Sequence, residues 1–90
     1  MTTISRTVTI PNRRGLHARA SAKFVTLASS LPVDVAVRKD GAPVNGRSIM
    51  GLMMLGAAMG DCITISAEGD GAEQAVAALV ELVEAKFGED

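Results

Sequence analysis

The only histidine in the chain, His17, lies in the segment Arg14-Gly15-Leu16-His17-Ala18-Arg19-Ala20-Ser21, between a predicted strand and a predicted helix. The first turn of a helix carries unpaired backbone N–H groups and the positive end of the helix dipole, so it binds anions such as phosphate. A neutral imidazole there is a nucleophile whose phosphorylated form would meet donors already in place. His17 is therefore a candidate phosphoryl acceptor, with Arg19 as a nearby cation. The alternative is a partly exposed histidine with no role.

A second informative segment, residues 44–56, is rich in methionine. Ser48 is a predicted N-cap for a short helix over 49–55. A helix this short cannot bury all of its apolar residues, and its spacing directs Leu52 and Leu55 to the core. Methionine is flexible and suits surfaces that bind partners of varied shape, although it also serves as filler in a core. If the methionines form a partner-binding surface, the exposed apolar side chains are Ile49, Met50 and Met53.

Seven segments carry the periodicity of regular secondary structure. Alternating apolar and polar residues predict strands, and apolar residues spaced for one helical face predict helices. The predicted strands are 2–10, 33–37, 42–44 and 61–68, and the predicted helices are 18–29, 49–55 and 72–87. Because the strands alternate, we expect an α+β fold with an antiparallel sheet, one face wet and the other covered by helices.

The composition bounds the domain organisation and the class of partner. Ninety residues with 48% hydrophobic content predict one globular domain over 1–90. With no Trp, no Tyr and two Phe, the chain lacks the aromatic platforms of single-stranded nucleic-acid binders, so no nucleic-acid partner is expected. Residues 1–47 hold eight basic and two acidic side chains, whereas residues 48–90 hold one basic and eight acidic side chains. This asymmetry either cancels as the halves interleave or marks a basic face near His17 for an acidic partner.

Other features argue against a membrane segment, a disulfide or a metal site. The N-terminus lacks the apolar core of a signal peptide, and the apolar stretch 49–59 is too short to span a membrane. A lone cysteine, Cys62, excludes an intrachain disulfide and is predicted to be a small core residue. One histidine and one cysteine do not readily supply a metal's ligands, so no metal or cofactor is expected. We therefore predict a cytoplasmic protein without membrane insertion.

Two segments together point to a family. Gly15-Leu16-His17-Ala18-Arg19 resembles the active-site motif of HPr, the histidine-containing phosphocarrier of the bacterial phosphotransferase system. Asn45-Gly46-Arg47-Ser48-Ile49-Met50-Gly51-Leu52-Met53-Met54-Leu55 resembles the family's regulatory-serine motif, and the separation of the two motifs fits as well. The resemblance covers essentially the whole chain. It implies an open-faced β-sandwich, in which a four-stranded antiparallel sheet of order 1-4-2-3 carries three helices on one face.

The resemblance also implies roles for particular residues. His17 would accept a phosphoryl group from enzyme I and pass it to an enzyme IIA domain, which makes the chain a phosphocarrier rather than an enzyme. Arg19 resembles the family's phosphate-pairing arginine, a role that suits the donor fork of a guanidinium. Ser48 resembles the serine modified by HPr kinase/phosphorylase. We expect a monomer with an apolar docking patch around His17, formed by Leu16, Ala18, Ile49, Met50 and Met53.

The chain departs from the family pattern at Ala20, where most members have proline after the arginine. Alanine is a good helix former, and the chemistry does not use this side chain. The substitution is therefore compatible with phosphoryl transfer. Ala20, with Thr26 and Ser29 where family members have lysines, brings the chain closer to the nitrogen-related branch. Ser48 in a full regulatory motif points instead to kinase control. The alternative function is a regulatory module of that branch, whose phosphorylation state gates partner binding rather than sugar uptake.

Overall fold

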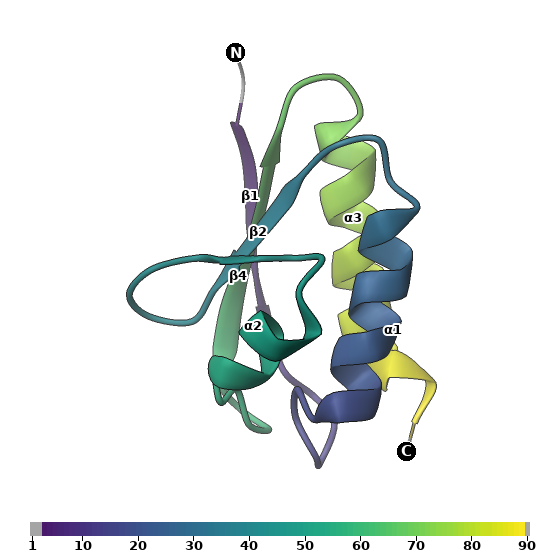
Figure 1. Cartoon of the computed structure of the whole chain (residues 1–90). Coiled ribbons are helices and arrows are strands. Elements are labelled where there is room, and N and C mark those ends of the chain that lie inside the picture. Colours follow the sequence, from purple (N-terminus) through teal and green to yellow (C-terminus); the bar gives the residue numbers. More distant parts are fainter. Residues whose placement is uncertain (1–2, 90) are drawn as a thin grey trace.

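The computed structural model describes residues 3–89 and contains the predicted order of strands and helices (Figure 1). The strands are β1 (Thr3–Thr9), β2 (Val35–Arg38), β3 (Val44–Asn45) and β4 (Cys62–Glu68), and the helices are α1 (Ala18–Ser29), α2 (Ile49–Met54), α3 (Ala72–Glu84) and the 3₁₀ turn η1 (Lys86–Gly88). The predicted α+β class is confirmed, and the ends of most elements differ from the predicted ranges by a few residues. Thr2, where the first predicted strand begins, lies outside the described residues.

The four strands form one antiparallel sheet of order β1-β4-β2-β3, as the family resemblance implied. The register pairs Ile65 of β4 with Arg6 of β1 on one side and with Val37 of β2 on the other. Figure 1 shows α1 and α3 side by side across one face of this sheet, with α2 beside the first half of α1. The other face is open and polar, and the hydroxyl oxygens of Thr7 and Thr64 lie 3.0 Å apart on it.

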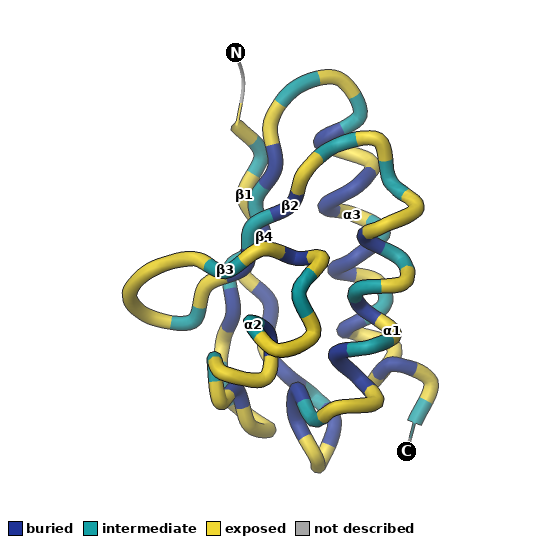
Figure 2. The backbone as a smooth tube through the Cα atoms, viewed as in Figure 1, coloured by how far each residue is buried: buried dark blue, intermediate teal, exposed yellow. Residues whose placement is uncertain are grey.

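The core lies between the sheet and the helices (Figure 2). Period-2 alternation turns Val8, Ile63 and Ile65 inward, where the buried faces of the helices meet them. Buried residues recur at helical spacing on the inner face of α1 and α3, as the sequence pattern predicts. The helical core residues are Ala20, Phe24 and Ala28 of α1, Leu52 of α2, and Ala72, Ala75, Val76, Leu79, Val80 and Val83 of α3.

The third helix is shorter than the predicted range 72–87, because the chain reverses after Glu84. Lys86 and Phe87 both adopt left-handed backbone angles, with φ of 59° and 55°. Each such residue costs about 1–2 kcal/mol. The reversal buries the ring of Phe87, which is 1% exposed, and full burial of such a side chain is worth roughly 1.5–3 kcal/mol. Burial of Phe87 therefore offsets much of the strain, and the turn brings Glu89 next to His17 at the start of α1.

The prediction that Cys62 lies in the core is wrong, because its side chain is exposed. The alternation of β4 places Ile63 and Ile65 inside, so Cys62 must share the outer face of the sheet. Its Sγ lies 3.5 Å from the hydroxyl of Thr9 on the neighbouring strand.

Candidate functional site

The loop between β1 and α1 is held in place by a close backbone contact at Gly15. Gly15 has a φ of +62°, and a Cβ on it would overlap the carbonyl oxygen of Ala57 and lie 2.9 Å from Cα of Ala58. Only glycine fits both requirements. The next residue, Leu16, donates its backbone N–H to the same Ala57 carbonyl at 2.9 Å. The loop that leads to His17 is thereby fixed against the segment between α2 and β4.

The expectation that Leu16 belongs to an exposed docking patch is wrong, because Leu16 is 5% exposed and lies in the hydrophobic core. The backbone contact with Ala57 draws this part of the loop inward. Leu16 is held further by the hydroxyl of Ser21, which donates to its carbonyl at 3.1 Å. Ser21 is itself fully buried. Leu16 therefore anchors the loop to the core. Ala18 is exposed, as predicted.

His17 is the N-cap residue of α1. Its backbone is extended, with φ of −72° and ψ of 178°, and its carbonyl accepts the first helical hydrogen bond, from the N–H of Ser21 at 2.9 Å. Its ring turns back over the helix, where the backbone N–H of Arg19 donates to Nδ1 at 3.3 Å. An imidazole in place of the usual Ser, Thr, Asp or Asn thus caps the helix. The lone pair of Nδ1 points at the positive end of the helix dipole.

The other ring nitrogen of His17 faces a carboxylate from the far end of the chain. Nε2 lies 2.9 Å from Oε2 and 3.0 Å from Oε1 of Glu89. Since Nδ1 accepts a hydrogen bond, the proton of the neutral ring belongs on Nε2, where it is donated to Glu89. The geometry therefore favours one tautomer, in which Nε2 carries the proton and Nδ1 keeps its lone pair.

Asn12 is the third residue of this arrangement. Its side chain is fully buried, and its Nδ2 donates to the carbonyl of Gly15 at 3.0 Å and to Oε1 of Glu89 at 2.8 Å. The hydrogen bond from Asn12 is the main cause that lowers the pKa of Glu89 below its ordinary value of 4.5, and the contact with His17 adds to it. Sequence reasoning missed both Asn12 and Glu89. Asn12 looks like ordinary turn material, and no sequence signal links Glu89 to His17.

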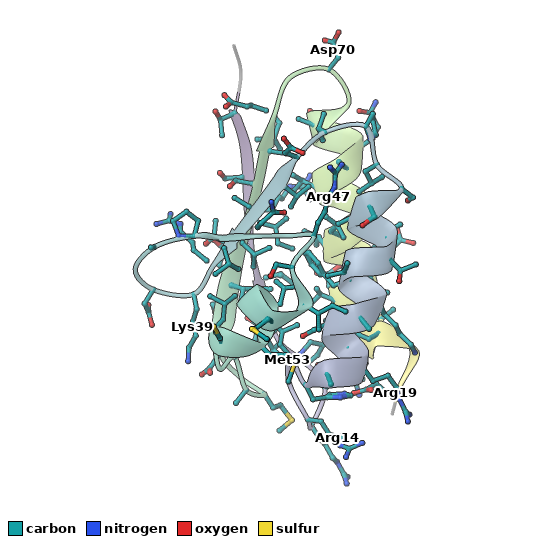
Figure 3. The ribbon with its side chains drawn as sticks, viewed as in Figure 1. Arg14, Arg19, Lys39, Arg47, Met53 and Asp70 are labelled. Carbon is teal, nitrogen blue, oxygen red and sulfur yellow. The ribbon has the colours of Figure 1, made fainter. Side chains whose placement is uncertain are left out.

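Three arginines lie near His17 in the sequence, on the loop before α1 and in the first turn of that helix. Arg13, Arg14 and Arg19 are all exposed, and none of their side chains forms an ion pair within residues 3–89. Figure 3 shows Arg14 and Arg19 projecting from the end of the molecule where α1 begins, opposite the end that carries Asp70. The guanidinium groups are therefore free to meet an anion or an acidic partner, in agreement with the basic face considered from the charge distribution.

The short helix α2 exposes most of its apolar side chains. Ile49 is 42% exposed, Met50 72% and Met53 44%, as predicted, whereas Leu52 is fully buried and fixes the helix to the core. Ile49, Met50 and Met53 line a shallow apolar groove. Met54 is its fourth lining residue, which is 78% exposed and was not predicted. Figure 3 places Met53 on the side of α2 that faces the start of α1.

Ser48 caps α2 as predicted. Its backbone is extended, and its Oγ accepts the N–H of Gly51 at 2.9 Å. A Cβ on Gly51 would lie 3.0 Å from that oxygen and 3.2 Å from Cβ of Val44, so glycine keeps the cap close to β3. Ser48 is half-buried and is followed directly by the exposed side chains of Ile49 and Met50. A group added to its hydroxyl would therefore stand at the edge of the apolar groove.

Within residues 3–89, no cluster of three or more His, Cys, Asp or Glu side chains is placed to hold a metal ion. In the same part of the chain, no helix has the length and apolar character needed to cross a membrane. A larger groove lies between β2, β3 and the end of β4, and its lining includes neither His17 nor Arg19.

Comparisons with known proteins agree with this fold. The sequence model described as "PTS HPr component phosphorylation site" matches residues 4–85. The phosphocarrier protein HPr of Neisseria meningitidis serogroup A is 45% identical over 86 residues, which cover 96% of this chain and 97% of that protein. The phosphocarrier protein NPr of Shewanella violacea is 40% identical over 89 residues, 99% of this chain and 98% of that protein.

A solved structure shows the same fold. The crystal structure of HPr-C-His from Thermoanaerobacter tengcongensis matches with a TM-score of 0.89 and 48% identity, covering 100% of this chain and 99% of that one. The fold and the matches define the class as a small phosphocarrier protein, rather than an enzyme that turns over a small substrate. This chain belongs to the HPr family of the phosphotransferase system.

Proposed function

We propose that this protein accepts a phosphoryl group on Nδ1 of His17 from phosphorylated enzyme I and passes it to an enzyme IIA domain. The observation that carries the proposal is the orientation of the ring. Nδ1 faces the start of α1, while Nε2 is occupied by Glu89. In the transfer, the Nδ1 lone pair forms the N–P bond, the bond from phosphorus to the donor atom breaks, and its electron pair stays with the donor. The helix N–H groups then face the phosphoryl oxygens.

Arg19 is proposed to pair with the phosphoryl group during transfer. Its backbone N–H already contacts Nδ1, and its side chain is exposed and forms no ion pair with another described residue. A guanidinium can donate two parallel hydrogen bonds to phosphate oxygens. Arg13 and Arg14 add positive charge at the same end of the molecule, which favours approach of an acidic partner surface.

The exposed apolar surface of α2 is proposed as part of the docking patch for enzyme I and enzyme IIA domains. Its members are Ile49, Met50 and Met53, with Ala18 on the first turn of α1. The packing of α2 beside α1 brings this surface next to the loop that carries His17. Flexible methionine side chains can adapt to partners of different shape, which a carrier that meets both a donor and an acceptor requires.

Ser48 is proposed as a regulatory phosphorylation site for HPr kinase/phosphorylase. The free N–H groups at the start of α2 accommodate a phosphate, so the fold should tolerate it. The same phosphate would place a charge of about −1.5 to −2 beside an apolar interface, which costs desolvation and repels acidic partner residues. The effect of phosphorylation would therefore fall on partner binding.

A regulatory role in the nitrogen-related branch is the second candidate. The relative from Shewanella violacea named NPr is 40% identical, and Ala20 stands where most family members have proline. In this role the phosphorylation state of His17 would gate partner binding rather than sugar uptake. For either role we propose a monomer acting in the cytoplasm.

Transfer assays test the proposal. The purified protein is incubated with radiolabelled phosphoenolpyruvate and enzyme I, and candidate IIA domains are then added. We expect acid-labile label on the wild type, no label on His17→Ala, and loss of label to a IIA domain on its addition. Label that stays on His17 with every IIA domain would favour the regulatory role, and label on His17→Ala would refute the assignment of the acceptor.

A further inference from the structure

We propose that Glu89 is a positioning residue for phosphoryl transfer: its carboxylate accepts the Nε2–H of His17 and stabilises the positive charge that the ring gains when Nδ1 takes a phosphoryl group. This inference rests on the proposed function and deepens it. Nε2 lies 2.9 and 3.0 Å from the two carboxylate oxygens. The side chains of His17 and Glu89 are only 21% and 20% exposed, so the contact is partly shielded from water.

The carboxylate is also held in place by Asn12, which donates to the oxygen Oε1 that lies 3.0 Å from Nε2 of His17. The Asn12 amide nitrogen donates to both the Glu89 carboxylate and the carbonyl of Gly15, and this residue is fully buried. Two acceptors face that end of the amide, which fixes its orientation. Glu89 therefore joins a chain of hydrogen bonds that runs from the loop before α1 to the ring of His17.

The backbone that carries Glu89 is also fixed. Phe87 is buried in the core, and its carbonyl accepts a hydrogen bond from Nζ of Lys23 at 2.7 Å. Lys86 and Phe87 both have left-handed backbone angles, although neither residue is glycine. The N–H of Glu89 then donates to the carbonyl of Lys86 at 2.9 Å. Strained backbone of this kind persists where the surrounding contacts over-determine it, and here the strained turn delivers a carboxylate to the reactive ring.

The electron balance of the reaction shows what the carboxylate does. The Nδ1 lone pair enters the N–P bond, and the bond from phosphorus to the donor atom breaks with its electron pair left on the donor. Nε2 keeps its proton, so the neutral imidazole becomes a phosphoimidazolium with one positive charge. A hydrogen bond from Nε2–H to a carboxylate strengthens as that charge develops. When the phosphoryl group leaves, the ring returns to the neutral Nε2–H form, ready for another cycle.

Charge-changing variants test the inference. Glu89→Gln keeps the shape of the side chain but removes its charge, and Glu89→Ala removes the contact. The matched control is Glu84→Gln, since Glu84 is exposed at the end of α3 and forms no hydrogen bond or ion pair with another side chain in residues 3–89. Phosphoramidate serves as a small phosphoryl donor that needs no partner protein. The readouts are the initial rate of His17 phosphorylation and the proton NMR signal of Nε2–H.

We expect Glu84→Gln to react at the wild-type rate, and Glu89→Gln and Glu89→Ala to react about tenfold more slowly. The Nε2–H signal should be retained in Glu84→Gln and shifted or lost in both Glu89 variants. Wild-type or faster rates for Glu89→Gln would overturn the inference, as would an unchanged Nε2–H signal. NMR signals of Phe87 report whether the turn is intact. Failure to take label from enzyme I would refute the proposed function without altering this comparison.

Discussion

Replacing Gly15 with alanine is expected to destabilise the protein more than any other glycine change with a similar backbone angle. Gly15 has a φ of +62°, where an L residue costs about 1–2 kcal/mol. The added Cβ would also overlap the Ala57 carbonyl, which cannot retreat easily because it accepts the N–H of Leu16 at 2.9 Å. Overpacking of this kind adds roughly 1–3 kcal/mol. We therefore expect a total loss of about 2–5 kcal/mol.

Gly41 provides a matched control for this prediction. Its φ is +65°, nearly that of Gly15, and nothing lies within 4 Å of a Cβ built on it. Gly41→Ala should therefore lose only the conformational contribution, about 1–2 kcal/mol. In calorimetry, Gly15→Ala should melt about 5–20 °C below Gly41→Ala, given a shift of about 4–8 °C for each kcal/mol in a domain of this size. Equal melting temperatures would show that the contact with Ala57 is not tight and would refute the reasoning.

Arg19→Lys keeps the charge but loses the guanidinium fork, so it should recover only part of the transfer rate lost in Arg19→Ala; equal rates for Arg19→Ala and the wild type would remove this role. Met50→Glu should weaken binding to enzyme I by roughly tenfold in calorimetric titration, with little change in the unfolding midpoint. Lost stability with unchanged binding would instead place Met50 in the core. Ser48→Asp should slow phosphorylation by enzyme I and leave the melting temperature near that of the wild type, whereas a wild-type rate for enzymatically phosphorylated Ser48 protein would contradict an inhibitory role. The pKa of Asp61 is lowered by the Ala58 N–H and by Lys39, and the pKa of Glu89 is lowered by Asn12 and His17. Because both pKa values are lower in the folded state, the two carboxylates stabilise the fold at neutral pH. This stabilisation is lost as the pH falls below the ordinary pKa values of 3.8 and 4.5. Chemical denaturation at several pH values should therefore show a decline in acid that Glu89→Gln and Asp61→Asn reduce; an unchanged decline would contradict the assignment.

The order of strands and helices could be predicted because the local patterns agree with the tertiary packing. The predicted strand 61–68 contains the buried Ile63 and Ile65 of β4, and the predicted helix 18–29 contains the buried Phe24 of α1. Ser48 was recognised as a helix cap from residue type alone, and its Oγ does accept the Gly51 N–H. These features depend on neighbours close in the sequence.

The errors arose where distant contacts decide the outcome. Leu16 lies between exposed arginines and His17 in the sequence, but the hydrogen bond to Ala57 turns it into the core. The helical periodicity predicts an end of α3 that is too late, because burial of Phe87 favours a left-handed turn that no periodicity signals. The contact between His17 and Glu89 joins the two ends of the chain. Such pairs are fixed by the sheet order and helix packing, which a reading of local pattern does not supply.

Nδ1 of His17 is the proposed phosphoryl acceptor. Phosphorus and nitrogen NMR of the protein after phosphorylation by enzyme I test this most directly, because they distinguish the two ring nitrogens. We expect a single acid-labile phosphoryl group on Nδ1, since the N–H of Arg19 orients this nitrogen and Glu89 occupies the other. A phosphoryl group on Nε2, or on another residue while His17 remains unmodified, would contradict it.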